Sequence, residues 1–273
     1  MSGCPPGSSV VQASVTAIED IHSEYKRFHH AVAKAQLTAW LPDGQRFLLD
    51  ISGPGSRSAE LAADAGHMVL RVIDAAAAPP GDTAPPGDTA PSGDTAPPGG
   101  ERRHADRLRV IAADGCGLDF LPAGCADGVI AEDGTLSRRL AAEALVADIS
   151  RVLRPGGEVL ACVDSLNLGM AVLAQQNHWP HLVDLLHADV VLVPWPDGTI
   201  TRCYGAEQLR ELFTGNGFEV RWTRPRTMLS SSTVSYLLAR DPGSFERLVQ
   251  AELRARCDDS VGGQLVVSAT RLG

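Results

Sequence analysis

The first forty residues carry apolar side chains at helical spacing. Val15, Ile18, Ile21 and Tyr25 follow one another at steps of three or four residues, which predicts a helix over 8–40 with one apolar face. A Pro-Asp-Gly sequence comes next, and proline and glycine end regular elements. We therefore expect an N-terminal helical cap over residues 1–44.

Beyond this cap, short apolar runs alternate with stretches of helix-forming residues. The runs predict strands at 46–51, 68–73, 108–113, 128–131, 158–163, 218–223 and 264–269. The predicted helices lie at 58–66, 137–153 and 206–213. Because strands that alternate with helices form doubly wound sheets, we expect an α/β, Rossmann-like domain over 45–273. Its sheet would be seven-stranded and mostly parallel, with helices on both faces.

The helix predicted at 137–153 has a distinct core face and a distinct end. The residues expected to face the core are Leu140, Ala144, Leu145, Ile149 and Leu153. The Arg-Pro-Gly-Gly sequence at 154–157 should stop the helix and reverse the chain tightly, because the residue before a proline avoids the helical conformation and glycine permits sharp turns.

Two segments interrupt the alternation. Residues 79–100 read PPGDTA, PPGDTA, PSGDTA and PPGG, with no apolar side chain bulkier than alanine or proline. Such a segment cannot bury enough surface to offset its ordering entropy, so we expect a disordered insertion at 75–103. Its periodic aspartates do not predict a metal site, because calcium-binding repeats need a bulky apolar residue in each turn. The poorly patterned stretch at 166–204 is expected to be a substrate-side insertion.

Composition and charge narrow the choice of partner. The chain has 24 Lys and Arg against 33 Asp and Glu, for a formal net charge of -9, which disfavours a nucleic-acid partner. No apolar run approaches the roughly 18 residues of a membrane span, and the opening residues lack the segments of a signal peptide. The six cysteines are scattered, as in a reducing compartment. We expect a cytoplasmic protein that does not bind membranes.

Acidic residues end three of the predicted strands. Asp50 precedes the turn Ser-Gly-Pro-Gly-Ser at 52–56, Asp74 ends the second strand, and Asp114 ends the third. The carboxyl ends of parallel strands meet at the edge where open α/β sheets bind ligands. A glycine turn there lets the backbone approach a ligand closely, and an acid after the second strand can accept hydrogen bonds from ribose hydroxyls.

Four stretches of the sequence, within 45–163, together resemble class I S-adenosylmethionine-dependent methyltransferases of the small-molecule type. They are LLDISGPGSRSAELA at 48–62, Asp74, AADGCGLDFLPAGCADGVIAEDG at 112–134 and DISRVLRPGGEVL at 148–160. The resemblance implies S-adenosyl-L-methionine as cofactor, with its carboxylate at the glycine loop, its ribose on Asp74 and its adenine near Asp114. The implied cofactor-binding residues are Asp50, Ser52, Gly53, Gly55, Asp74, Asp114, Gly115 and Glu132.

The glycine loop departs from the family pattern, which reads acid, apolar, Gly, any, Gly, any, Gly. The first glycine is missing here, and Ser52 follows the apolar residue. Each of these residues also has a purely structural interpretation. Under it, Asp50 would accept from loop amides, Asp74 would cap its strand, Asp114 would form a turn, and the glycines would form a turn without a ligand.

The resemblance also implies where the methyl acceptor binds. Substrate groups would come from Tyr25 and His29 in the N-terminal helix, and from His181 and Tyr204 after the fifth strand. His178 is the candidate general base, since imidazole titrates near neutral pH, and a surface or capping histidine is the alternative. Three arginines, at 221, 224 and 226, could grip an acidic substrate or form solvated strand-edge charge.

These features predict methyl transfer to the oxygen, nitrogen or carbon of a small molecule, in secondary metabolism. The altered glycine loop leaves two alternatives, a cyclisation or rearrangement without methyl transfer, and a non-catalytic relative that binds a protein partner. A homodimer through the N-terminal helix is compatible with the pattern, although no uninterrupted apolar stripe requires one.

Overall fold

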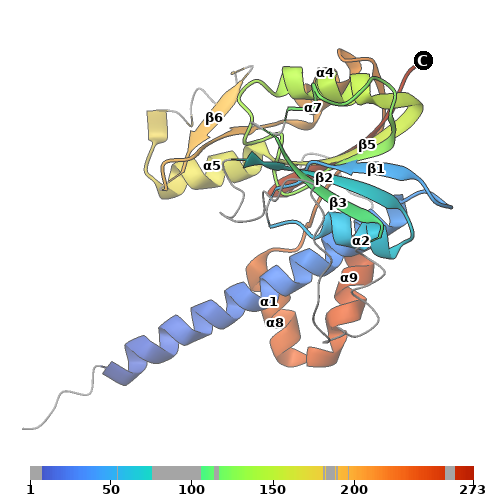
Figure 1. Ribbon diagram of the computed structural model, residues 1–273. Coiled ribbons are helices and arrows are strands. Elements are labelled where there is room, and N and C mark those ends of the chain that lie inside the picture. The colour runs from blue at the N-terminus through green and yellow to red at the C-terminus, as the bar shows by residue number, and fades with distance from the viewer. Residues whose placement is uncertain are drawn as a thin grey trace, which may run out of the picture.

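The described part of the chain is built around one seven-stranded sheet (Figure 1). The computed structural model describes residues 8–53, 55–75, 106–113, 117–180, 182, 188, 190–195, 197–255 and 262–273, with side chains described from residue 23 onward. The strands are β1 (Phe47–Asp50), β2 (Met68–Asp74), β3 (Leu108–Ala113), β4 (Ala126–Ala131), β5 (Leu153–Asp164), β8 (Phe218–Pro225) and β9 (Gln264–Arg271). Their order is β3-β2-β1-β4-β5-β9-β8. Because only β9 runs antiparallel to its neighbours, the predicted mostly parallel sheet is confirmed.

Helices cover both faces of this sheet. The described helices are α1 (Ser8–Trp40), α2 (Ser58–Asp64), α4 (Ala142–Val152), α5 (Leu166–Gln175), α7 (Ala206–Thr214), α8 (Ser231–Arg240) and α9 (Phe245–Arg254), with a short 3-10 turn, η3 (Pro242–Ser244). Figure 1 shows α4 and α7 above the sheet and α1 and α2 below it, in agreement with the two main apolar clusters. Helices on both faces are therefore confirmed as well.

The central strands divide their side chains between the two helix layers. In β1, Leu49 packs toward α4 and α7, whereas Leu48 packs toward α1 and α2. Val129 and Ile130 of β4 divide in the same way, and all four side chains are fully buried. A strand covered on both faces must be apolar at successive positions, which explains why these strands read as continuous apolar runs.

The Arg-Pro-Gly-Gly sequence at 154–157 stops its helix as expected. The helix α4 ends at Val152, and Leu153 is already extended, with φ −71° and ψ 147°. The four residues then form the irregular start of β5, with a positive φ of 78° at Gly156. At Gly157, a Cβ would lie 3.0 Å from the carbonyl oxygen of Asp127. Glycine is needed there because the two strands approach closely.

The helix predicted from residue 137 begins later, and that prediction was wrong at its start. It begins at Ala142, and Leu140 is 53% exposed. The preceding residues are tied to the strand ends instead: the hydroxyl of Thr135 donates to the carbonyl of Ile51, and the hydroxyl of Ser137 accepts from the amide of Asp164. The residues that α4 buries are Ala142, Leu145, Val146, Ile149 and Val152.

A second helical layer, which the sequence pattern did not reveal, supports α1. The helices α8 and α9 lie between β8 and β9 in the chain and pack beneath α1, where Phe28 and Val32 meet Val234 and Val249. The buried carboxylate of Glu252 accepts hydrogen bonds from two backbone amides after β8. This layer therefore holds both α1 and the segment that leaves the edge of the sheet.

The sequence predicts that the strand–helix alternation is interrupted at 75–103 and at 166–204, and the structure describes mainly the second of these segments. Within 166–204, α5 packs against a two-stranded antiparallel ribbon of β6 (Val191–Pro194) and β7 (Ile200–Cys203). The repeat insertion predicted at 75–103 lies almost entirely outside the described residues.

Candidate functional site

The turn after β1 is shaped by two buried polar side chains. Asp50 is fully buried, and its carboxylate accepts from the amide of Ser52 at 2.7 Å and from the hydroxyl of Ser58 at 2.6 Å. Burial raises the pKa of Asp50, against the opposing effect of these hydrogen bonds. The hydroxyl of Ser52 in turn accepts from the amide of Glu132 at 2.9 Å. Asp50 and Ser52 therefore fix the shape of the glycine loop from beneath.

Arg71, on β2, supports the same loop from the side. Its guanidinium forms an ion pair with Glu60 at 3.2 Å, and Nη2 donates to the carbonyl oxygens of Gly53 and Ser56 at 3.5 and 3.2 Å. Arg71 thus links the two ends of the glycine loop by donating to a carbonyl oxygen in each. Sequence reasoning overlooked this residue, because an arginine inside a strand looks like an exposed charge.

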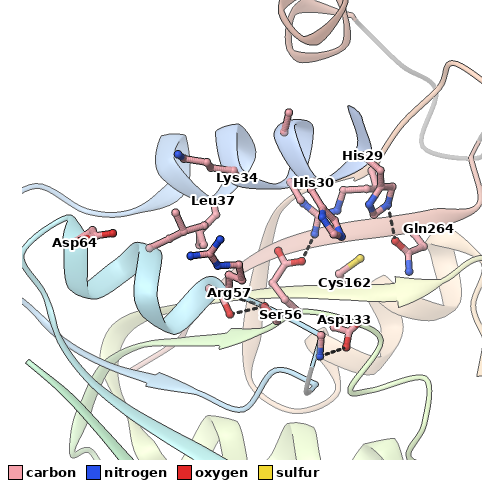
Figure 2. Close-up of a pocket in the computed structure, with 17 residues that line it drawn as sticks. His29, His30, Lys34, Leu37, Ser56, Arg57, Asp64, Asp133, Cys162 and Gln264 are labelled. Atoms are coloured by element: carbon pink, nitrogen blue, oxygen red, sulfur yellow. Dashed lines mark hydrogen bonds and ion pairs between the residues drawn. The ribbon is translucent and has the colours of Figure 1, made fainter. Parts of the chain in front are cut away.

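A cavity of about 430 Å³ lies between α1, the glycine loop and the carboxyl ends of the central strands. Figure 2 shows α1 across the top of this cavity, with His29, His30 and Lys34 along it, and Cys162 and Asp133 below. Among the residues predicted from the sequence, it is lined by His29, Gly55, Glu132 and Arg226. The lining residues that sequence reasoning did not assign include Lys34, Leu37, Cys162 and Gln264.

A buried ion pair forms the base of the cavity. Arg226, which is 1% exposed, pairs through Nη2 with Oε2 of Glu132, and its Nη1 donates to Oε1 of Gln36 at 2.7 Å. The other carboxylate oxygen of Glu132, Oε1, is buried and has no hydrogen-bond partner among the described residues. Of the three arginines around this strand end, Arg226 is therefore interior, whereas Arg221 is exposed.

His29 faces the cavity as a neutral imidazole. Burial, followed by the charge of Arg226, lowers its pKa to about 4. Its Nε2 lies 3.1 Å from Oε1 of Gln264, whose amide nitrogen donates to the carboxylate of Asp164 at 3.3 Å. Because a carboxylate only accepts, it fixes the orientation of the Gln264 amide. His29 must then carry its proton on Nε2, which leaves Nδ1 as a hydrogen-bond acceptor.

Cys162 contributes an apolar surface to the same cavity. It is 1% exposed, and burial raises the pKa of its thiol to about 12. The thiol therefore stays protonated at neutral pH, and a protonated thiol is a poor nucleophile. Its side chain belongs to the apolar cluster beneath α1 and also contacts the buried guanidinium of Arg226.

The remaining residues predicted from the sequence lie apart from the cavity or outside the described residues. Asp74 ends β2 and is half-buried, Tyr25 bonds Thr227 at 3.0 Å, and Tyr204 is buried beside Arg202. His178 follows α5 and is exposed. None of these four lines the cavity. The others, Asp114, Gly115 and His181, fall outside the described residues.

Two kinds of feature are absent from the described residues. No helix in the described ranges is long and apolar enough to cross a lipid bilayer. In the same part of the chain, no three His, Cys, Asp or Glu side chains gather as ligands for a metal ion.

No protein-family model and no curated protein matches the sequence. Solved structures do match the fold. A putative S-adenosylmethionine-dependent methyltransferase from Listeria monocytogenes is 13% identical, with a TM-score of 0.54 over 89% of this chain and 100% of that chain. The 1,6-didemethyltoxoflavin N1-methyltransferase of Burkholderia thailandensis, solved with its substrate and S-adenosylhomocysteine, is 16% identical over 100% and 94%, with a TM-score of 0.51. The [4+2]-cyclase SpnF is 19% identical over 90% and 82%, with a TM-score of 0.50. The fold is that of S-adenosylmethionine-dependent methyltransferases.

Proposed function

We propose that this chain transfers the methyl group of S-adenosylmethionine to a small molecule bound in the cavity under α1. The observation that carries the proposal is that this cavity is bounded by the glycine loop on one side and by a fixed set of polar side chains on the other. A cavity of about 430 Å³ lies within the range of small-molecule sites. The fold, shared with methyltransferases, supports this assignment.

The residues at the strand ends fit such a cofactor. The amide of Gly55 already donates to a carboxylate, that of Asp133, at 3.2 Å, so the loop has a donor for the carboxylate of the methionine moiety. We place the ribose hydroxyls on Asp74 at the end of β2, where a carboxylate can accept both. The bound cofactor would supply an electrophilic methyl group on its sulfonium, and the protein mainly has to align an acceptor with it.

The cavity residues would perform that alignment. Nδ1 of His29 is an acceptor directed by the Gln264–Asp164 pair, so it would accept a hydrogen bond from an O–H or N–H group of the substrate. Leu37 and Cys162 are buried and would help exclude water from the reacting groups. We assign the orienting role to His29 rather than to His178, because His29 lines the cavity and His178 does not.

A second candidate is a cyclisation or rearrangement without methyl transfer. It is favoured by one structural neighbour, the [4+2]-cyclase SpnF, and by the shortened glycine loop. Both candidates place their substrate in the same cavity. They differ in whether the mass of the acceptor rises by one methyl group.

Calorimetric titration with S-adenosylmethionine and S-adenosylhomocysteine tests the proposal. We expect both to bind the wild-type chain, and Asp74→Ala to weaken binding about ten-fold or more, because hydrogen bonds to a charged group are lost. Glu246→Ala, an exposed acid on α9, is the matched control and should leave both affinities unchanged. If neither compound binds the wild-type chain, the proposed function is wrong. Unchanged affinity in Asp74→Ala would overturn the ribose assignment.

A further inference from the structure

The glycine loop is polarised, with carbonyl groups on one side and an amide on the other. Arg71 binds the carbonyl oxygens of Gly53 and Ser56 from β2. On the opposite side, the amide of Gly55 donates to Oδ2 of Asp133 at 3.2 Å, as Figure 2 shows by a dashed line. The side that faces the cavity is therefore suited to an anion.

That side is covered by the chain itself. A Cβ at Gly53 would collide with Nη2 of Arg138 and with Oδ2 of Asp133, and one at Gly55 would lie 3.2 Å from the same Oδ2. The guanidinium of Arg138 pairs with the Asp133 carboxylate at 3.4 Å and also donates to the Asp133 carbonyl. A single carboxylate thus lies against both glycines and is bound by an amide and an arginine.

The backbone of Asp133 directs this carboxylate over the loop. Asp133 has a positive φ of 58°, and Gly134 after it has a φ of 65°. Few residues other than glycine adopt this left-handed conformation, and Asn and Asp are among those that do. The turn returns the side chain from the end of β4 toward the loop after β1. Unlike Asp50, Asp133 remains partly exposed, with a side chain that is 40% accessible.

We propose that Asp133 occupies the position of a ligand carboxylate, and that the amide of Gly55 and the guanidinium of Arg138 form a carboxylate-binding site at the edge of this cavity, where Gly55 and Asp133 line it. A ligand carboxylate of the amino-acid type displaces Asp133 and takes both donors. The inference rests on the proposed function, since that ligand is the methionine portion of the cofactor. It makes Arg138 a binding residue and Asp133 an internal competitor.

Two related compounds separate the carboxylate from the rest of the cofactor. S-adenosylhomocysteine carries the amino-acid carboxylate, and 5′-methylthioadenosine retains the adenosine and the thioether without it. Asp133→Gly removes the competitor and suits the left-handed backbone. We expect calorimetry to give about five-fold tighter binding of S-adenosylhomocysteine, as removal of a partly exposed ion pair allows. The affinity for 5′-methylthioadenosine should not change.

Arg138→Gln gives the opposite result under the same proposal. The affinity for S-adenosylhomocysteine should fall about five-fold or more, because a charge-assisted contact is lost, while that for 5′-methylthioadenosine stays the same. Asp133→Asn, which also tolerates a positive φ, checks that charge and not backbone freedom causes the gain. Thermal melting of each variant shows that it is folded.

The outcomes distinguish this inference from the proposed function. If both compounds bind and neither substitution changes the affinity for S-adenosylhomocysteine, Asp133 is no competitor and the inference is wrong, while the proposed function stands. If the two compounds respond equally to Asp133→Gly, the effect is not on the carboxylate, and the inference is wrong again. If neither compound binds the wild-type chain or Asp133→Gly, the proposed function fails and the inference fails with it. Binding that appears only in Asp133→Gly would support both.

Discussion

Two ion pairs lie beside the same cavity and differ sharply in burial. Arg226 and Glu132 both line the cavity, whereas of the second pair only Asp133 does. At the base of the cavity, the side chains of Arg226 and Glu132 are 1% and 10% exposed, whereas those of Arg138 and Asp133 at the glycine loop are 46% and 40% exposed. A buried charge that loses its partner is strongly destabilising, but an exposed pair contributes little to stability. The comparison indicates that the base of the cavity is fixed and that the glycine-loop side can exchange partners.

The neighbours of each pair strengthen this contrast. Arg226 is also bound by Gln36, whose amide donates to the Arg226 carbonyl at 3.2 Å, and the segment after it is held by Glu252. Among the described residues, the Asp133 carboxylate is bound by the Gly55 amide and by Arg138. Replacement of the Asp133 carboxylate by a ligand carboxylate at the glycine loop therefore disturbs few other contacts.

The largest expected effect comes from breaking the buried pair. Arg226→Met should lower the free energy of unfolding by about 3–5 kcal/mol, because Glu132 is left buried and unpaired. Urea denaturation measures this value. Arg221→Met, which changes an exposed arginine on the strand that precedes Arg226, is the matched control and should stay within about 0.5 kcal/mol of wild type. Adding Glu132→Gln to Arg226→Met should recover part of the loss. A single Arg226→Met variant as stable as the control would contradict the fixed-base interpretation.

The next effect is a pH dependence that comes from His29. Its pKa is lowered from 6.5 to about 4 in the folded chain, so between these values the unfolded chain binds one more proton than the folded chain. Stability is then lost as the pH falls from about 6.5 to about 4, by about 2–3 kcal/mol. Urea denaturation at a series of pH values should show this loss in the wild-type chain and a smaller loss in His29→Asn.

Gln264→Glu tests whether the side chain at position 264 contacts His29 and influences its pKa. A carboxylate beside Nε2 should raise the pKa of His29, which moves the titration of its imidazole to higher pH in NMR spectra. Gln264→Met removes the hydrogen bond without adding charge and should cause no such rise. The absence of any upward movement in Gln264→Glu would mean that the two side chains are not in contact.

The smallest effect belongs to the exposed pair. Arg138→Gln should change the free energy of unfolding by less than about 1 kcal/mol, even though it weakens carboxylate binding. Urea denaturation set beside the calorimetric titrations checks this separation of stability from binding. A loss as large as that of Arg226→Met would mean that both pairs are structural.

The sequence predicted the parts of the fold that local patterns encode. Strands covered on both faces, such as β1 and β4, must be continuously apolar, and they were placed within a few residues of their bounds. The helix α8 was missed, although Ser230 caps it by accepting from the amide of Thr233, and serine is a common signal at this position. Its apolar residues pack on α1 and not on the sheet, so the strand–helix alternation gave no reason to expect it.

The site was only partly predictable, for a related reason. The glycine loop and Glu132 stand at the ends of recognisable strands, so sequence alone proposed them. Arg226 is 94 residues from Glu132, and no local pattern distinguishes it from the exposed Arg221. The role of Asp133 depends on a turn that places it against Gly55, which is 78 residues away in the sequence. Pairings of this range become visible only when the strand order is known.

A crystal structure of the chain with S-adenosylhomocysteine would show which carboxylate binds the glycine loop. We predict that the ligand carboxylate lies on the Gly55 amide and the Arg138 guanidinium, that the ribose lies at Asp74, and that Asp133 is turned away from the loop. The Arg226–Glu132 pair should remain as it is. A ligand bound elsewhere, or Asp133 still on Gly55 with the ligand in place, would contradict this prediction.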